Sequence, residues 1–361
     1  MKRSFNALLL LLMVPAVVLA TGGKFKGKYT KEKKLNKEYT VNADASLTVS
    51  NSYGNIDVVS WSENRTVIEV VIRTNGNNEE KVQKKLDDID VEFSGNASGV
   101  SARTVFNGKK KGWSWWGNDN NNVNMEINYT IKVPVTNSVD LSNDYGPINL
   151  NRLEGRAEIS CDYGQINIGE LMADNNDLNF DYTKNSTIGY MKTGSINADY
   201  SNFTLERTEA LDLNADYTKS EVLEVHTLEY SCDYGKLTIG EATNIDGSGD
   251  YIPLRIGTLN GNLKVRADYG SISVDRVSSS GGNINIESDY AGIKIGFDSG
   301  YNFDFDLDLR YASLKGEDYV EMQHTHKESS RKTYKGYHGS KGSGNTIYVN
   351  SEYGGVTFKK N

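Results

Sequence analysis

The chain has 361 residues and a formal net charge of −8, with 37% hydrophobic residues, 35 glycines, 22 tyrosines and only 4 prolines. It is rich in Asn, Asp, Gly, Ser, Thr and Tyr, a composition that favours β-strands joined by many turns. Between Asp140 and Lys315 lie 29 acidic and 14 basic residues, a net of −15, which argues against nucleic acid as a partner.

Residues 1–20 have the pattern of a secretory signal peptide. Lys2 and Arg3 precede an apolar run over 7–19, and the run ends in the small-residue pattern Val-Leu-Ala. The run is too short to span a bilayer comfortably, and no later stretch approaches 18 apolar residues. We therefore expect an exported chain without a transmembrane segment, in the periplasm, at the cell surface or outside the cell.

Residues 21–137 are expected to form an N-terminal β cap. A basic arm is followed by stretches of β-branched and aromatic residues that predict strands. Glu79–Asp87 is the one predicted helix, because Asn78 precedes it and its first turn is acidic. The predicted strands cover 66–73, 91–93, 100–106 and 123–133.

A polar, glycine-rich loop inside this cap carries three of the chain's four tryptophans, Trp113, Trp115 and Trp116. Indole rings beside three lysines suit stacking on sugar rings, cation–π contacts or a membrane interface. The alternative is that the loop folds back and the indoles pack over the neighbouring sheet. The three tryptophans are therefore a candidate ligand-binding site.

From residue 138 to 361 one phrase returns, with Asp-Tyr at its centre. Successive tyrosines from Tyr145 to Tyr269 are 17 to 19 residues apart, and the next two steps are 21 residues each. Positions −4, +3 and +5 from each tyrosine are mostly aliphatic, which predicts two short strands with alternating inward side chains. We expect a single-domain parallel β-helix (a β-solenoid) with about 18 residues per coil, and an insertion at about 316–345 before a last coil.

An aspartate precedes the tyrosine in nine of these phrases. Neighbouring carboxylates about 5 Å apart repel by roughly 0.8 kcal/mol in water, so the row needs compensation. Each carboxylate could accept a backbone N–H two residues on, often that of glycine, and fix the corner. Otherwise the row could hold divalent cations. We favour the corner role and expect no cofactor; the candidate cation ligands are Asp144, Asp162, Asp181, Asp199, Asp216 and Asp233.

The orientation of the repeated tyrosines has two interpretations. Strand alternation sends the rings inward, where they would fill the corner of each coil. A twist at the turn would instead place them on one face as an aromatic strip suited to glycan or protein contact. We favour the inward packing.

Cys161 and Cys232 occupy the same position in phrases that lie four coils apart. Four coils correspond to roughly 19 Å, whereas a disulfide needs Cα atoms within about 7 Å of each other. Both cysteines are therefore expected to be buried free thiols.

The order of these features resembles the bacterial putative-adhesin domain families of unknown function, including the head-domain type. The resemblance lies in the Tyr-Gly-Asn-Ile-Asp-Val phrase at 53–58, the entry strand at 128–134, the Gly-x-Ile repeats and the closing phrase at 342–356, and covers most of residues 40–361. It implies an exported β-helical protein, with some relatives linked to envelope stress. It supplies no catalytic residues.

No enzymatic constellation emerges from the sequence. Of the four histidines, His324 and His326 alternate on one predicted strand but lack a third ligand at a convincing spacing. We therefore expect a non-catalytic, adhesin-like envelope protein that binds a glycan or protein surface through the solenoid face or the tryptophan loop. The alternatives are a β-helical polysaccharide-active enzyme and an envelope-stress or scaffold component.

Overall fold

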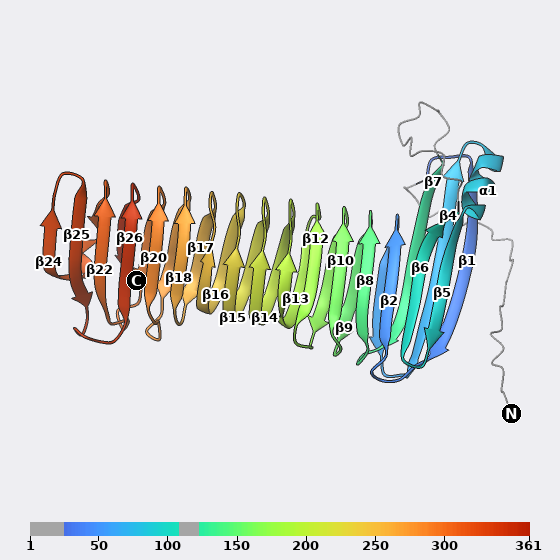
Figure 1. The fold of residues 1–361 in the computed structure, drawn as a ribbon, viewed down its shortest axis with the longest axis horizontal. Coiled ribbons are helices and arrows are strands. Elements are labelled where there is room, and N and C mark those ends of the chain that lie inside the picture. Colours follow the sequence, from blue (N-terminus) through green and yellow to red (C-terminus); the bar gives the residue numbers. More distant parts are fainter. Residues whose placement is uncertain (1–24, 108–122) are drawn as a thin grey trace.

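The computed structural model describes residues 25–107 and 123–361 (Figure 1). Within them the chain is all-β apart from one α-helix and one 3-10 turn, which confirms the predicted class. The strands pair into one long mixed sheet. The predicted signal peptide and Trp113, Trp115 and Trp116 lie outside the described residues. No helix of the described part is long and apolar enough to cross a bilayer.

The N-terminal part combines antiparallel and parallel pairs. Its elements are β1 (Tyr29–Thr40), β2 (Ser46–Ser52), β3 (Ile56–Trp61), β4 (Arg65–Gly76), α1 (Glu79–Asp87), β5 (Ile89–Asn96), β6 (Gly99–Phe106) and β7 (Asn124–Pro134). β4 pairs antiparallel with β1 and β7, and β5 with β6. β2 and β3 pair parallel with β6 and β7. The predicted helix is confirmed, and the Asn78 side chain caps it by accepting the N–H of Lys81.

Two parallel ladders of strands follow (Figure 1). Strands that end one to three residues before a repeated tyrosine form the leading ladder, and strands that begin two to four residues after it form the trailing ladder. The leading strands are β8 (Ser138–Asp144), β10 (Ala157–Asp162), β12 (Asn176–Asp181), β18 (Leu263–Asp268) and β20 (Ile284–Asp289). The trailing strands are β9 (Pro147–Leu153), β11 (Gln165–Leu171), β17 (Pro253–Leu259), β19 (Ser271–Val277) and β21 (Gly292–Phe297).

Four longer strands belong to both ladders and connect them. They are β13 (Ser186–Asn197), β14 (Asn202–Asn214), β15 (Lys219–Ser231) and β16 (Lys236–Ser248). The first half of β13 pairs with β11 and its second half with β12, for example. Like residues face one another from strand to strand, as Leu141, Ile159 and Leu178 do.

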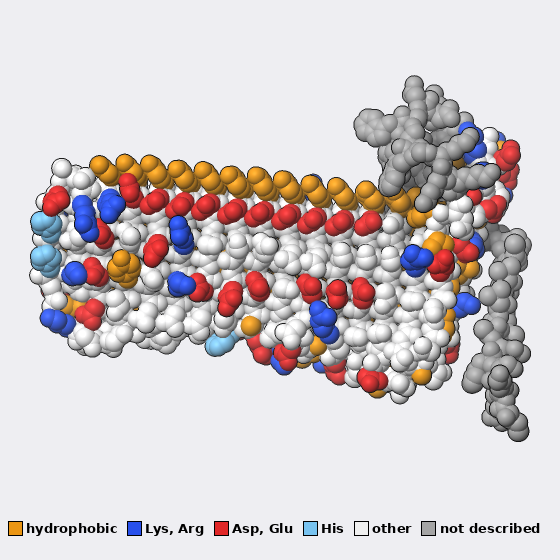
Figure 2. All heavy atoms as spheres, in the orientation of Figure 1, with side chains coloured by type: hydrophobic (Ala, Val, Ile, Leu, Met, Phe, Trp, Pro, Cys, Tyr) orange, Lys and Arg blue, Asp and Glu red, His pale blue; other side chains and the backbone are white. Residues whose placement is uncertain are grey.

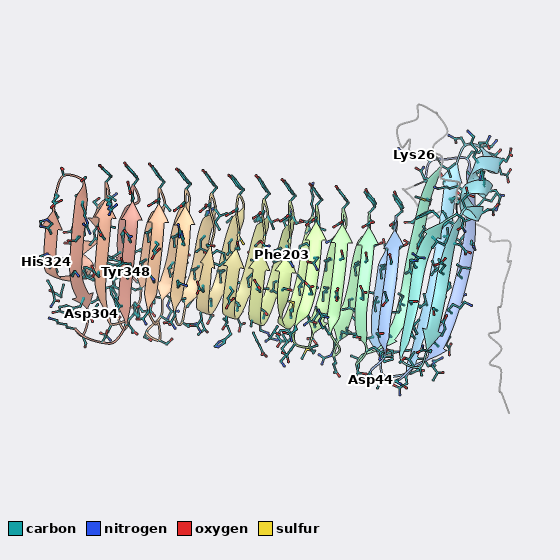
Figure 3. All side chains as sticks on the ribbon, in the orientation of Figure 1. Lys26, Asp44, Phe203, Asp304, His324 and Tyr348 are labelled. Atoms are coloured by element: carbon teal, nitrogen blue, oxygen red, sulfur yellow. The ribbon has the colours of Figure 1, made fainter. Side chains whose placement is uncertain are left out.

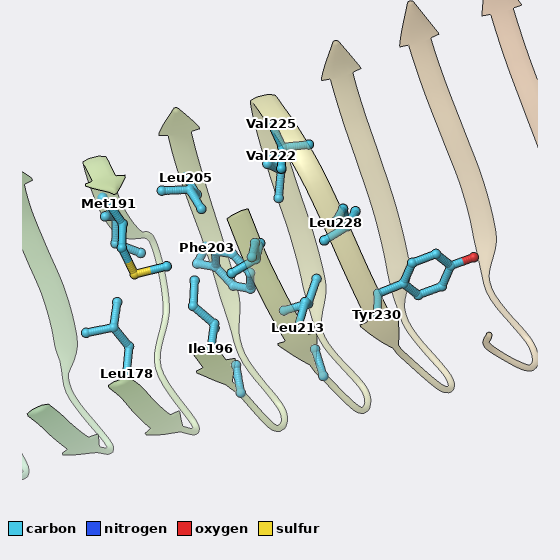
Figure 4. Packing of buried hydrophobic residues seen from close by; sticks show 14 of the residues in the cluster. Leu178, Met191, Ile196, Phe203, Leu205, Leu213, Val222, Val225, Leu228 and Tyr230 are labelled. Carbon is cyan, nitrogen blue, oxygen red and sulfur yellow. The ribbon is translucent and has the colours of Figure 1, made fainter. Parts of the chain in front are cut away.

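The core lies between the two ladders. Inward side chains of both form one buried aliphatic cluster (Figure 4). Burying each Leu or Ile stabilises the fold by about 1.5–3 kcal/mol. Cys161 and Cys232 are part of this core and are free, as predicted. Burial raises the pKa of each thiol to about 12.

The last two strands of the chain do not lie at the end of the sheet. The elements are β22 (Phe303–Arg310), β23 (Leu314–Lys315), the turn η1 (Glu317–Tyr319), β24 (Glu321–Lys327), β25 (Arg331–His338), β26 (Thr346–Glu352) and β27 (Val356–Lys360). β26 lies between β20 and β22, and β27 between β21 and β23. The inserted segment forms an antiparallel hairpin, β24–β25, on the outer side of β22. β26 and β27, the last strands of the chain, therefore pair on both sides with earlier strands, and the hairpin lies beyond them on the outer side of β22.

Candidate functional site

Each repeated tyrosine stands at a turn between a leading and a trailing strand, with its backbone in the left-handed region. Twelve tyrosines have φ between 51° and 66°, namely Tyr53, Tyr145, Tyr163, Tyr182, Tyr200, Tyr217, Tyr234, Tyr251, Tyr269, Tyr290, Tyr311 and Tyr353. This backbone interrupts the strand alternation and turns the ring outward. The favoured inward packing was therefore wrong. The turns stay hydrogen-bonded to each other, as where the Tyr145 N–H donates to the Asp162 carbonyl oxygen at 2.9 Å.

The twelve rings form one continuous stack, which we call the tyrosine ladder. Neighbouring ring centroids are 4.7–5.2 Å apart and the planes differ by 3–10°. Because of the inserted strand, the Tyr353 ring lies between those of Tyr290 and Tyr311. Eleven rings are 46–60% exposed and line one edge of the molecule (Figure 2). Tyr53 is less exposed and has Phe106 edge-on at 6.3 Å.

The stack decides which parts of each ring can meet a partner. Its step matches the 4.7–4.9 Å spacing of paired strands, so each ring packs offset on the next. The neighbouring rings cover part of both faces of each interior ring. Ring edges and phenol hydroxyls are open along the whole ladder. A sugar ring therefore cannot lie over the full face of an interior tyrosine.

Some phenols of the ladder have a raised pKa, which favours their protonated form. Desolvation, followed by the neighbouring tyrosines and aspartates, raises the pKa of Tyr163, Tyr200 and Tyr251 above the ordinary value. Tyr353 is shifted in the same direction, again with desolvation as the largest cause. At neutral pH each of these hydroxyls can both donate and accept a hydrogen bond.

A second row runs beside the ladder (Figure 2). It consists of the residue before each tyrosine, and we call its acidic members the aspartate row: Asp144, Asp162, Asp181, Asp199, Asp216, Asp233, Asp250, Asp268 and Asp289. Each carboxylate from Asp181 to Asp268 accepts the backbone N–H of the aspartate in the next turn, at 2.7–3.1 Å. The predicted donor two residues on was wrong, because the bond runs between turns.

The aspartate row lacks internal charge compensation. None of the ion pairs in residues 25–107 and 123–361 includes one of its nine members. Desolvation and the charges of Asp199 and Asp162 raise the pKa of Asp181. The row continues at Glu352, followed in space by Arg310, whose Nη1 lies 3.9 Å from a Glu352 carboxylate oxygen.

The six candidate cation ligands all lie in this row, one per turn. Within the described part of the chain no group of three or more His, Cys, Asp or Glu side chains could hold a metal ion. The row offers carboxylates in single file rather than a coordination shell, and cation binding by it stays a prediction. His324 and His326 stand exposed on β24, where His326 contacts Glu328 at 3.0 Å.

A shallow groove of about 430 Å³ lies on the outer face of β12–β15. Asp177, Asp212 and Glu229 line it, and the last two are partners on adjacent strands. The Ser195 hydroxyl donates to Asp177 at 2.9 Å. This carboxylate-lined groove is the feature expected of the polysaccharide-active alternative. These residues were not predicted as a site. In the sequence they have the ordinary pattern of solvent-facing positions on a strand.

Comparisons with known proteins found a likeness to solved structures at low sequence identity. No protein-family model and no curated protein matches it. A putative lipid binding protein and a putative adhesin, both from Parabacteroides distasonis, share 13% and 12% identity with TM-scores of 0.35. They match 72% and 73% of this chain and 95% and 97% of their own. A putative cell adhesion protein from Clostridium sporogenes has 11% identity, a TM-score of 0.18, and coverage of 92% of this chain and 100% of its own.

Proposed function

We propose that this chain is a non-catalytic, adhesin-like binding protein of the cell envelope and that the tyrosine ladder is its contact surface. The observation that carries the proposal is the single file of exposed rings along one edge. A left-handed backbone costs a non-glycine residue about 1–2 kcal/mol, and glycine would adopt it freely. The backbone of a turn alone would favour glycine over tyrosine at these twelve positions, and large exposed aromatic surfaces mark interaction sites.

The repeated architecture supports the same function. We propose that the two ladders of strands are the sides of a β-solenoid body over 138–361, with about 18 residues per coil and a cap over 21–137. The support is the parallel pairing of each turn with the next on both sides of the tyrosine. A solenoid of this kind presents one long, regular surface. Residues 1–20 as a signal peptide would place that surface in the envelope or outside the cell.

The ladder limits the kind of contact. Hydroxyls and ring edges favour hydrogen bonds and edge contacts to an elongated partner, either a protein or a glycan chain lying along the ridge. Trp113, Trp115 and Trp116 remain a second candidate contact, with ring faces suited to sugars.

The test uses the full chain on arrays of immobilised glycans and peptides. The ladder variant replaces Tyr200, Tyr217 and Tyr234 by Asn, which tolerates the left-handed backbone. The control variant replaces Leu223, Tyr319 and Tyr348, which are exposed but outside the ladder, by Asn. We expect the ladder variant to lose array binding and the control to keep it. Equal binding by both variants would overturn the proposal.

The tryptophans are tested on the same arrays. Changing Trp113, Trp115 and Trp116 to Ala removes the indole faces without touching the ladder. Loss of binding in this variant alone would move the contact surface to the tryptophan loop. Unchanged binding would end the tryptophan hypothesis.

The enzymatic alternative has one observation in its favour, the groove lined by Asp177, Asp212 and Glu229. Glycosidases use pairs of carboxylates, and neighbours on adjacent strands have a suitable separation. A polysaccharide-active enzyme would release reducing ends from an array glycan, and a double substitution of Asp212→Asn and Glu229→Gln would abolish the release. No release from any glycan would contradict it. If the chain is a scaffold or envelope-stress component, we expect no binding to the arrays and no released reducing ends.

A further inference from the structure

We infer that the partner of the tyrosine ladder is a basic, extended polypeptide segment, which lies lengthwise along the ladder with its Lys and Arg side chains on the aspartate row. This inference rests on the proposed function, because it names the partner of the same surface. Three features carry it: the arrangement of the two rows, their charge, and one cation that already stands in the row.

The two rows form one composite surface. Every aspartate of the row is the residue directly before a ladder tyrosine, so nine of the twelve turns present a phenol and an aspartate carboxylate side by side (Figure 2). Six of the carboxylates, from Asp181 to Asp268, do not swing freely, because one oxygen of each accepts the backbone N–H of the aspartate in the next turn. A fixed carboxylate loses less conformational entropy when it binds a cation. The second oxygen of each aspartate can accept hydrogen bonds from a partner.

The charge of this surface selects a cationic partner. Neighbouring carboxylates about 5 Å apart repel by roughly 0.8 kcal/mol in water. None of the ion pairs in the described residues includes one of the nine aspartates of the row. The segment from Asp140 to Lys315, which includes the row, has a net charge of −15, and the row itself supplies nine of its 29 acidic residues. An acidic glycan or a second copy of this chain would be repelled. A neutral glycan would gain nothing from the charge and would find only partly open ring faces on the interior rungs.

Arg310 shows how a cation fits the row. It occupies the aspartate position before Tyr311, next to Glu352 in the neighbouring turn. Its Nη1 lies 3.9 Å from a Glu352 carboxylate oxygen, and the tyrosines that follow these two residues, Tyr311 and Tyr353, are stacked on each other. A guanidinium or ammonium from a partner could occupy equivalent places between the other carboxylates.

The length of the surface sets the size of the partner. Twelve rings at about 4.8 Å per step make a ridge of roughly 53 Å, which an extended segment of about 16 residues would cover. Side chains on one face of an extended strand repeat every 6.6 Å or so, which does not match the ladder. Long, flexible Lys and Arg side chains can bridge this mismatch. Recognition should therefore depend on charge density more than on sequence.

The probe is a fluorescent peptide of about 16 residues with alternating Lys and Ser, titrated with the full chain and followed by anisotropy. The test variant carries Asp199→Asn, Asp216→Asn, Asp233→Asn and Asp250→Asn. Asparagine keeps the oxygen that accepts the backbone N–H and removes only the charge. The control variant carries Glu206→Gln, Glu209→Gln, Glu224→Gln and Glu241→Gln, which remove the same four charges from exposed positions on the trailing strands.

We expect the aspartate variant to bind the peptide about tenfold or more weakly and the control variant to lose less than about threefold. Raising the salt concentration should weaken the wild type, because exposed charges are screened. Equal losses in both variants would show unspecific attraction by net charge and would overturn the inference. No binding of the peptide, together with array binding that depends on the ladder tyrosines, would overturn the inference and leave the proposed function intact. Empty arrays as well would overturn both.

Discussion

At the scale of single residues, the ladder tyrosines meet two demands at once. Each takes a left-handed backbone, which costs about 1–2 kcal/mol, and each gains a stacked neighbour on one or both sides, worth about 0.5–1.5 kcal/mol per pair. Stacking therefore offsets most of the backbone cost. The sequence alone could not predict this outcome, because a positive φ is rare for aromatic residues and strand alternation sends the ring inward.

Tyr217 allows the two contributions to be separated. Both Tyr217→Gly and Tyr217→Ala remove the stacked ring, but only alanine keeps a Cβ that clashes in the left-handed region. We expect the alanine variant to be less stable than the glycine variant by about 1 kcal/mol. Urea denaturation followed by circular dichroism measures the difference. A glycine variant as unstable as the alanine variant would show that the backbone strain at this turn is negligible.

Asp181 gives a prediction with a defined sign in pH. Its pKa in the folded chain is raised by desolvation and by Asp199 and Asp162, so the folded state disfavours its charged form. Asp181→Asn should therefore raise the unfolding temperature at pH 7. The gain should shrink as pH falls through the raised pKa of the folded state, and it should be lost below the ordinary aspartate pKa of about 3.9, where wild-type Asp181 becomes protonated in both states. Thermal melts at pH 7 and pH 3.5 measure this, and a gain that grows on acidification would contradict the account.

At the scale of elements, the periodicity of the sequence predicted where the strands lie in the chain, but it did not predict the order of all strands in the sheet. The aliphatic positions before and after each tyrosine are buried, as Leu141, Ile148 and Leu150 illustrate. The 17- to 21-residue steps also gave the parallel register. They could not show that β26 and β27 insert between earlier strands, because a period carries no information about which turn becomes the neighbour. Tyr230 and Gly247 are exceptions to the aliphatic residues at this repeat position, and they are partners on neighbouring strands. Their pairing explains the glycine, because a Cβ on Gly247 would overlap the Tyr230 ring.

The inserted C-terminal strands should be essential to that end of the core. Phe358 on β27 is buried and packs against Phe297, Phe303 and Phe305 at centroid distances of 5.6–6.1 Å. Phe358→Ala should destabilise the fold by about 3–5 kcal/mol. Tyr348→Ala, on β26 with a 39% exposed ring, is the matched control and should cost far less. Hydrogen exchange of β22 and β26 would locate the effect, and equal protection in both variants would contradict the inserted packing.

At the scale of the whole molecule, the structure is a long body, and the tyrosine ladder and the aspartate row run along one edge of it (Figures 2 and 3). The sequence predicted the all-β class and the recurring phrase, and it offered the aromatic strip as the less favoured of two orientations. It could not rank them, because one left-handed residue per turn decides the orientation of all twelve rings. The ladder, which the sequence favoured as a corner filler, therefore becomes a candidate contact surface beside the tryptophan loop, which lies outside the described residues.

The most direct test of the ladder as a contact surface is tyrosine nitration of the full chain, mapped by mass spectrometry, without and with a saturating Lys/Ser peptide. In the free chain the ladder tyrosines should react, whereas the buried Tyr129, Tyr301 and Tyr334 should not. With peptide bound, we predict protection along the ladder and none at Tyr319 or Tyr348, which are exposed elsewhere. Ladder tyrosines that react equally in the free and the bound chain would contradict the account.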